Sequence, residues 1–212
     1  MLDYLWSHYD RIFTLLWQHL ILTISTLCIA LVISLPIGLL LARYKWVSVP
    51  VLSVLGILYS IPSLAMFAFL IPFIGLGAKT AIIALVAYSQ LILVRNVMVG
   101  FQSIDPAIIE AGRGMGLSAK ELFMKIQLPL ALPIILGGLR IATVSTIGIA
   151  TIAAWINAGG LGVILFEGLY QNHTAKMLWG TVVVSLLAIA ANQLLMMLEK
   201  RMALKAKGEL EV

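Results

Sequence analysis

The chain has 212 residues, of which 62% are hydrophobic and only 11% are charged, and its mean hydropathy is +1.08. No soluble domain of this size needs so much apolar surface, so the composition indicates one polytopic helical membrane domain. The net charge of +5 lies in short segments beside apolar runs, which argues against a nucleic-acid partner; the single cysteine excludes an internal disulfide, and three histidines with nine acidic residues disfavour a metal or hydrolytic site.

Residues 1–19 are predicted to form an amphipathic helix on the membrane surface. Their apolar residues recur at helical i, i+3 and i+4 spacing. Asp3 and Asp10 stand where a signal peptide would carry positive charge, so the segment is not read as a signal peptide. Trp6 and Trp17 are typical of a bilayer interface. Nothing soluble follows for this helix to pack on, which favours a surface location.

Five apolar segments are long enough to be read as membrane spans. Pro62, in the second segment, frees a carbonyl within the bilayer, which is tolerated only where neighbours or water re-satisfy it. That pattern fits a helix lining a pathway, and equally a simple packing kink. The predicted spans are residues 20–41, 51–74, 80–99, 130–156 and 176–198.

Two further segments complete the predicted organisation. Residues 157–175 are too short and too rich in glycine to span, so an outer loop with a short dipping helix is expected. Residues 199–212 are charged and are expected to fray, with residues 200–212 as a cytoplasmic tail. The five-span domain is therefore assigned to residues 20–199.

Two arginines fall in the predicted spans, Arg95 near the inner end of the third and Arg140 about a third of the way into the fourth. Arginine in lipid is costly and usually faces protein or water. Both are predicted to be structural charges. Anchoring to backbone carbonyls is the favoured role for Arg140, with substrate contact as the alternative.

The polar loop, residues 105–129, is the longest stretch that a membrane could not accept. Asp105 is placed to cap a helix that begins at Pro106, where the missing N–H costs nothing. Three glycines between residues 112 and 116 loosen and end that helix. Ala111 and Gly112 are expected to leave a flat surface for another protein.

A second helix is predicted in the same loop. Ser118 and Glu121 have the spacing of a capping box, and Leu117 with Leu122 is placed to form its hydrophobic staple. Pro129 is expected to stop this helix. The loop is thus predicted to be a helix, a glycine corner and a second helix; the alternative is an ordinary polar connection.

Positive charge predicts the orientation of the chain. With the polar loop in the cytoplasm, ten lysines and arginines lie on the inner side, while only Arg11, Lys79 and Lys176 lie outside. The flipped topology would reverse that ratio. The N-terminus is therefore expected outside and the C-terminus in the cytoplasm.

The polar loop also carries a recognisable spacing. The run Glu110-Ala111-Gly112, three residues, Gly116, nine residues and then Ile126-Gln127-Leu128-Pro129 resembles the EAA loop of ABC importer permeases. Gly112 stands where that pattern has a second alanine, a small-for-small change.

Other segments indicate which group of ABC importer permeases the chain resembles. Over roughly residues 20–195, IPSLAMFAFLIPFIGLG, IDPAIIEAGRGMG, LPLALP and AGGLG together are similar to permeases of the glycine betaine/carnitine/choline group of ABC importers. The EAA loop and AGGLG also occur in methionine-importer permeases. The IPSLA run and YSQLILVRN favour quaternary amines, with methionine or another small solute as the alternative cargo.

The resemblance implies the type I ABC importer permease fold in a bacterial plasma membrane. It implies a separate ATPase that binds the loop, and a lipid-anchored or periplasmic substrate-binding protein. ATP and Mg²⁺ would be held by the ATPase, since this chain has no glycine-rich phosphate loop and is expected to bind no cofactor or metal. Membrane lipid is the remaining expected partner. The ATPase-coupling residues implied are Glu110, Ala111, Gly112, Arg113, Gly116, Leu117, Ser118 and Ala119.

A transport path is predicted from polar and aromatic residues in the spans. Five helices mostly fill their own centre, so a permease dimer, of identical or related chains, is expected to form the path at its interface. Aromatic faces attract quaternary ammonium ions, although such residues also form interfacial belts. The candidate path residues are Tyr59, Ser63, Tyr88, Ser89, Thr143, Thr146 and Trp155, with Phe67 as a further aromatic.

Two functions outside the ABC class compete with this one. A stand-alone secondary carrier would transport without an ATPase, but it gives no reason for the polar loop. The predicted spans also lack the acidic residue that a proton-coupled carrier usually needs. A membrane scaffold without cargo would tolerate changes along the predicted path.

Overall fold

A computed structural model describes residues 2–206, with the side chains of residues 4–206, and this part of the chain consists of helices and connecting loops. The last residues of the predicted tail, 207–212, lie outside the described part. The helices are α1 Leu2–Ser7, α2 Tyr9–Arg43, α3 Lys45–Ser60, α4 Ser63–Ile74, α5 Ala78–Gln102, α6 Pro106–Gly114, α7 Ala119–Leu122, a π-helical turn η1 Phe123–Gln127, α8 Leu128–Ile152, a 3-10 turn η2 Ala153–Ile156, α9 Gly162–Tyr170 and α10 Thr174–Ala206.

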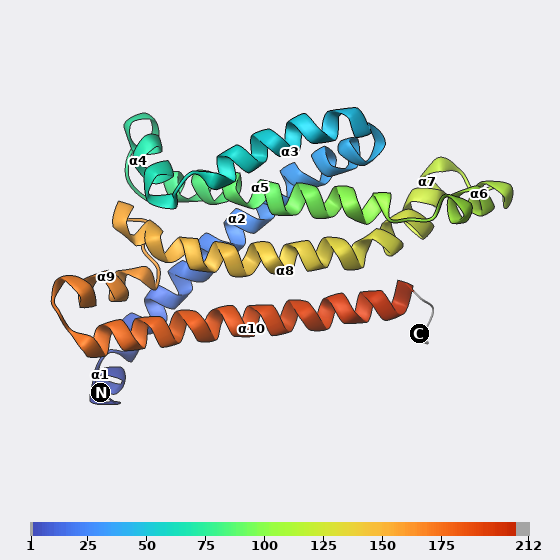
Figure 1. Cartoon of the computed structure of the whole chain (residues 1–212). Coiled ribbons are helices and arrows are strands. Elements are labelled where there is room, and N and C mark those ends of the chain that lie inside the picture. Colours follow the sequence, from blue (N-terminus) through green and yellow to red (C-terminus); the bar gives the residue numbers. More distant parts are fainter. Residues whose placement is uncertain (1, 207–212) are drawn as a thin grey trace.

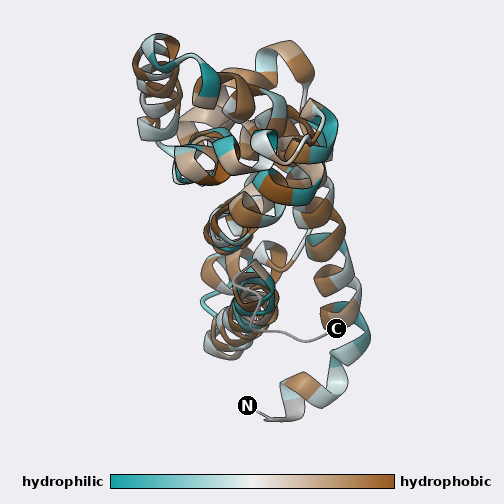
Figure 2. Ribbon diagram, turned by 90° about the vertical axis from the view of Figure 1, so that its right-hand side faces the viewer, coloured by the Kyte–Doolittle hydropathy of each residue, from teal (hydrophilic) through white to brown (hydrophobic). Residues whose placement is uncertain are grey.

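The long helices have the length and composition of membrane spans. Within the described residues four helical stretches pass that test, and α3 with α4 makes a fifth if this bent pair counts as one span. Figure 2 shows hydrophobic residues along the length of these helices, and large apolar side chains such as Val32 and Leu186 are exposed. Apolar surface on the outside of a bundle is what a lipid environment requires. The predicted all-helical, multi-pass membrane fold is confirmed.

The helices alternate in direction along one axis. In Figure 1, α2, α5 and α10 run toward the end that carries α6 and α7, whereas α3 and α8 run away from it. The last described residues of α10 lie at the same end as α6 and α7, and α1 lies at the opposite end. This arrangement matches an odd number of crossings.

Helix α5 is the centre of the bundle. Half of its most apolar stretch is buried, whereas none of the corresponding stretch of α10 is. Gly138 of α8 lets the two backbones approach, since a Cβ there would stand 2.3 Å from the Cβ of Asn96 on α5. Small residues at such crossings are the usual means of close packing between membrane helices.

The predicted boundary between a surface helix and a first span, near residue 20, is wrong. Helix α2 runs without a break for 35 residues from Tyr9, about 52 Å at 1.5 Å per residue. Ile12 and Leu15 are buried against residues of α9 and α10. One side of this segment therefore packs on protein, while large apolar residues expected to rest on lipid, such as Trp6, Phe13 and Trp17, remain exposed.

The second predicted span is sharply bent. Helix α3 ends at Ser60, α4 begins at Ser63, and their axes meet at 94°. The carbonyl of Ile61 accepts a hydrogen bond from the Tyr88 hydroxyl at 2.7 Å. A neighbouring span thus satisfies a backbone group released at the break, as Pro62 led us to expect.

Two predicted helix ends are also wrong. The second helix of the polar loop does not stop at Pro129 but continues through η1 into α8. In η1 the Leu128 N–H bonds the Phe123 carbonyl five residues back, and this wider turn leaves Pro129 in the first turn of α8, where a missing N–H is tolerated. Likewise α10 continues to Ala206, so residues 199–206 are helical rather than frayed.

Candidate functional site

The first helix of the polar loop is built as predicted. The Asp105 carboxylate accepts a hydrogen bond from the Ala107 N–H at 2.9 Å, and Pro106 occupies the first helical position. Figure 1 shows α6 and α7 standing off the end of the bundle, beyond the ends of α5 and α8. The loop is therefore a folded projection rather than an irregular connection.

The corner and the second helix are held by local hydrogen bonds. Gly116 has φ +80°, a left-handed conformation that favours glycine. The Glu121 N–H donates to the Ser118 hydroxyl at 3.3 Å, and the Ser118 N–H donates to the Glu121 carboxylate at 3.1 Å. Lys125 adds an ion pair to Glu121 at 3.0 Å. The predicted capping box is confirmed.

Gly112 does not contribute to a flat outer surface, which corrects that prediction. It is buried, and a Cβ at this position would stand 2.6 Å from Leu122 Cδ1 and 2.9 Å from Ile126 Cδ1. Gly112 therefore faces the second helix of the loop. Leu117 is half-buried, and the other implied coupling residues are exposed, namely Glu110, Ala111, Arg113, Gly116, Ser118 and Ala119.

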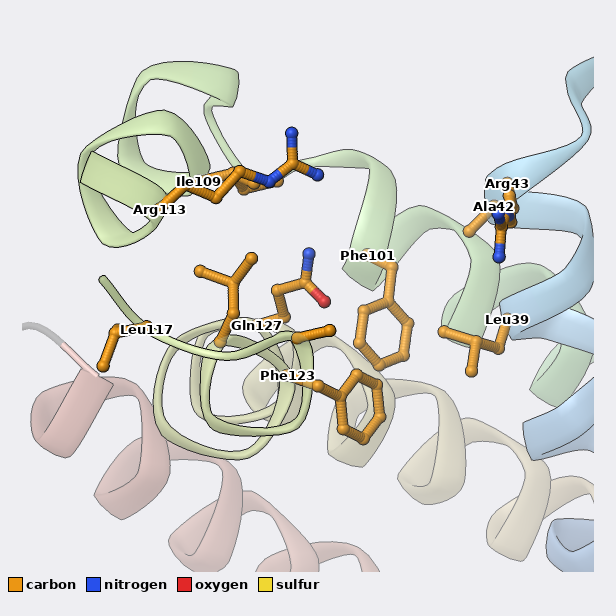
Figure 3. Close-up of a pocket in the computed structure, with 11 residues that line it drawn as sticks. Leu39, Ala42, Arg43, Phe101, Ile109, Arg113, Leu117, Phe123 and Gln127 are labelled. Atoms are coloured by element: carbon orange, nitrogen blue, oxygen red, sulfur yellow. The ribbon is translucent and has the colours of Figure 1, made fainter. Parts of the chain in front are cut away.

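A groove of about 690 Å³ separates the polar loop from the adjacent ends of α2 and α5. Figure 3 shows its residues, with the rings of Phe101 and Phe123 between the loop and α2. These rings stack at 5.7 Å between centroids. The sequence has no pattern that indicates contact between α2 and the polar loop, so the groove was not predicted. It is lined by Leu39, Ala42, Arg43, Phe101, Ile109, Arg113, Leu117, Ala119, Leu122, Phe123 and Gln127.

Four of the candidate path residues lie inside the subunit. Tyr88, Ser89, Thr143 and Thr146 are buried, as is Phe67. The hydroxyls of Ser89 and Thr146 lie 3.2 Å apart and join α5 to α8. Side chains packed in this way do not line an open route in this conformation, so their place in a transport path stays a prediction.

The remaining candidates are accessible. Tyr59 and Trp155 are exposed, and Ser63 is half-buried at the start of α4. Trp155 lies 5.9 Å from the Phe166 ring and 6.5 Å from the Tyr170 ring, measured between centroids. Sequence reasoning missed both neighbours, because α9 reaches Trp155 only through the folded 157–161 turn.

Arg140 is anchored by side chains rather than by carbonyls, contrary to the prediction. Its Nε donates to Glu199 Oε2 at 2.9 Å, and one terminal nitrogen donates to the Asn192 side-chain oxygen at 3.3 Å. Since α10 continues beyond residue 198, a carboxylate does lie on a long apolar helix, where Arg140 neutralises it. Arg95 is exposed toward the loop end of α5.

Residues 4–206 hold no group of three or more histidine, cysteine, aspartate or glutamate side chains placed to bind a metal ion. The carboxylates with ion-pair partners there, Glu121, Glu167 and Glu199, contact lysine or arginine.

Comparison with known proteins matches most of the chain. Residues 34–204 match the family described as binding-protein-dependent transport system inner membrane component. The carnitine transport permease protein OpuCB of Listeria monocytogenes is 38% identical, over 91% of this chain and 88% of that protein. The osmoprotectant import permease protein OsmW of Salmonella typhimurium is 37% identical, over 92% and 93% respectively.

Solved structures agree on the fold. A chain of the MetNI methionine ABC transporter, in an inward-facing conformation, superposes with a TM-score of 0.79 at 24% identity, over 90% of this chain and 95% of that chain. A chain of an amino acid ABC transporter crystallised with histidines gives a TM-score of 0.67 at 18% identity, over 92% and 95%. At these identities the likeness establishes the architecture alone.

Proposed function

Since the chain belongs to the family of binding-protein-dependent transport system inner membrane components, we propose that it is the permease subunit of an ATP-driven importer for quaternary amine compatible solutes. The observation that carries the proposal is the polar loop. It is a capped, two-helix projection at one end of a membrane bundle, with Glu110, Ala111 and Arg113 exposed.

We propose that a separate ATPase binds the polar loop and supplies the energy, with ATP and Mg²⁺ held by that partner. The loop is joined to the bundle on both sides. Ile104 packs with Val97 of α5 and with Ala131 and Ile135 of α8. A movement of the ATPase bound to the loop would therefore move α5 and α8 together. This rigid-body motion would switch the transport path between its inward-facing and outward-facing openings.

The path would form between two permease chains, identical or related, with cargo delivered by a lipid-anchored or periplasmic binding protein. Its N-terminus would lie outside and its C-terminus in the cytoplasm of a bacterial plasma membrane. The named relatives support glycine betaine, carnitine or choline as cargo. A quaternary ammonium has no N–H to donate, and the exposed Tyr59 and Trp155 offer aromatic faces to it.

The test is uptake by the reconstituted complex. The chain is co-purified with its ATPase, placed in liposomes with the binding protein, and assayed for uptake of glycine betaine, carnitine, choline and methionine. We expect ATP-dependent uptake of at least one quaternary amine. Glu110→Lys should lower uptake at least about fivefold without loss of membrane insertion, and Gly116→Pro should do the same, while Lys79→Gln at the opposite end should not.

Three results would contradict the proposal in different ways. Uptake without ATPase would indicate a stand-alone carrier. Uptake of methionine alone would overturn the cargo but keep the permease role. Normal coupling in both loop variants would remove the role assigned to the polar loop.

A further inference from the structure

The groove beside the polar loop carries positive charge without a protein counter-ion. Arg43 and Arg113 line it, and none of its eleven lining residues is acidic. Among the described residues neither arginine has an ion-pair partner. Figure 3 shows Arg113 reaching over the groove from α6, with Arg43 standing on α2 beyond the two phenylalanine rings. The site is electrostatically complementary to an anion.

The floor of the same groove is apolar. Leu39, Leu122 and the stacked rings of Phe101 and Phe123 form it. A small inorganic anion would leave this surface in contact with water. A ligand that satisfies both parts of the groove must join a negative head to a hydrocarbon body.

The apolar surface continues from the groove along α2. Val32, Leu35 and Leu39 are 72%, 41% and 39% exposed. Their spacing of three and four residues places them on one helix face, and Arg43 follows four residues later on the same face. This stripe extends about 16 Å from Arg43 toward the middle of α2. It therefore leads from the charged end of the groove into the hydrocarbon zone of a bilayer.

We propose that this groove binds an anionic phospholipid, with the phosphate held between Arg43 and Arg113 and one acyl chain lying along Leu39 and Val32. Guanidinium groups match phosphate oxygens in geometry as well as in charge. A lipid is favoured over a protein segment, because the stripe runs along a membrane helix. The lipid would join α2 to the polar loop, so the charge of the membrane surface would influence how firmly the loop is held.

The test is lipid retention by the intact chain, a measurement independent of cargo and of ATP. The purified protein is titrated with phosphatidylglycerol or phosphatidylcholine of equal acyl chains, and bound lipid is counted by native mass spectrometry. We expect one phosphatidylglycerol per chain to be held in preference to phosphatidylcholine. Arg43→Gln and Arg113→Gln should each weaken that binding about tenfold, whereas Arg201→Gln, an exposed arginine at the same end, should leave it unchanged.

A second pair of variants tests the apolar part. Leu39→Gln should weaken retention, and Leu40→Gln should not, because Leu40 is exposed on α2 but does not line the groove. Equal binding of both lipids, or an equal loss in Arg201→Gln, would overturn the proposal. So would unchanged retention in Arg113→Gln, whatever that variant does to ATPase capture, since Arg113 also belongs to the loop proposed to bind the ATPase.

Discussion

At the scale of single residues, Gly112 differs from the EAA pattern, which has alanine at this position. The sequence alone presents this as the exchange of one small residue for another. In the structure, a Cβ added at Gly112 would stand less than 3.0 Å from the side-chain ends of Leu122 and Ile126. A side chain at this position would require the ends of Leu122 and Ile126 to shift, so Gly112 belongs to the contact between α6 and the second helix of the polar loop.

Gly112→Val is expected to loosen the polar loop. A single added methyl group would meet only the flexible ends of Leu122 and Ile126, but the branched side chain of valine overpacks this contact, at a cost of about 1–3 kcal/mol. Hydrogen exchange of the α6 and α7 amides would measure it as faster opening. Gly114→Val is the matched control, because nothing lies within 4 Å of an added Cβ there; equal protection in both variants would contradict the tight packing at residue 112.

At the scale of elements, two prolines act differently according to what surrounds them. Pro62 separates α3 from α4 at a bend of 94°. The hydroxyl of Tyr88 on α5 donates a hydrogen bond to the Ile61 carbonyl at this bend. Pro129 breaks nothing, because the π-helical turn before it widens the backbone and carries the helix into α8. The second helix of the polar loop is therefore continuous with α8, so a movement of the loop would be passed directly to this membrane helix.

Tyr88→Phe is expected to destabilise the bent pair. The change removes the hydroxyl that donates to the Ile61 carbonyl and leaves this carbonyl unpaired, at a cost of about 1–3 kcal/mol. Denaturation of the purified chain in detergent would measure the loss. Tyr59→Phe is the control, since Tyr59 is exposed and its ring lies 6.1 Å from that of Tyr88. Equal stability of the two variants would show that water satisfies the carbonyl instead.

At the scale of the whole molecule, the polar loop and the ordered end of α10 lie at one end of the bundle, with α1 at the other. The Arg140–Glu199 pair joins the middle of α8 to the C-terminal part of α10. Lys79, just inside the start of α5, marks the end opposite to the loop. Ala119 marks the loop itself.

Cysteine labelling would establish how this bundle sits in the membrane. In a Cys28→Ser background, Lys79→Cys should react with a membrane-impermeant maleimide from outside the cell. Ala119→Cys should react only in inverted vesicles, because positive charge places the loop inside. Both positions are exposed. Labelling of both from the same side would refute the topology.

The sequence alone determined the features that depend on neighbouring residues or on composition. The membrane class, the long apolar helices, the Asp105 cap, the Ser118 capping box and the EAA spacing were all predictable, because local hydrogen bonding and the solvent decide them. The extent of helices was less predictable, since packing on α9 and α10 continues α2 through residue 20, and η1 carries the chain past Pro129.

Only the tertiary structure decided which distant residues meet. Glu199 forms an ion pair with Arg140, and the Tyr88 hydroxyl donates a hydrogen bond to the Ile61 carbonyl. Arg43 and Arg113 line the same groove, although 70 positions separate them in the sequence. Nothing in a local pattern encodes such pairs, because they depend on the angle and depth at which whole helices cross. The close approach of α8 to α5 at Gly138 and the 94° bend between α3 and α4 are further features of this kind, because they appear only when the helices are packed together.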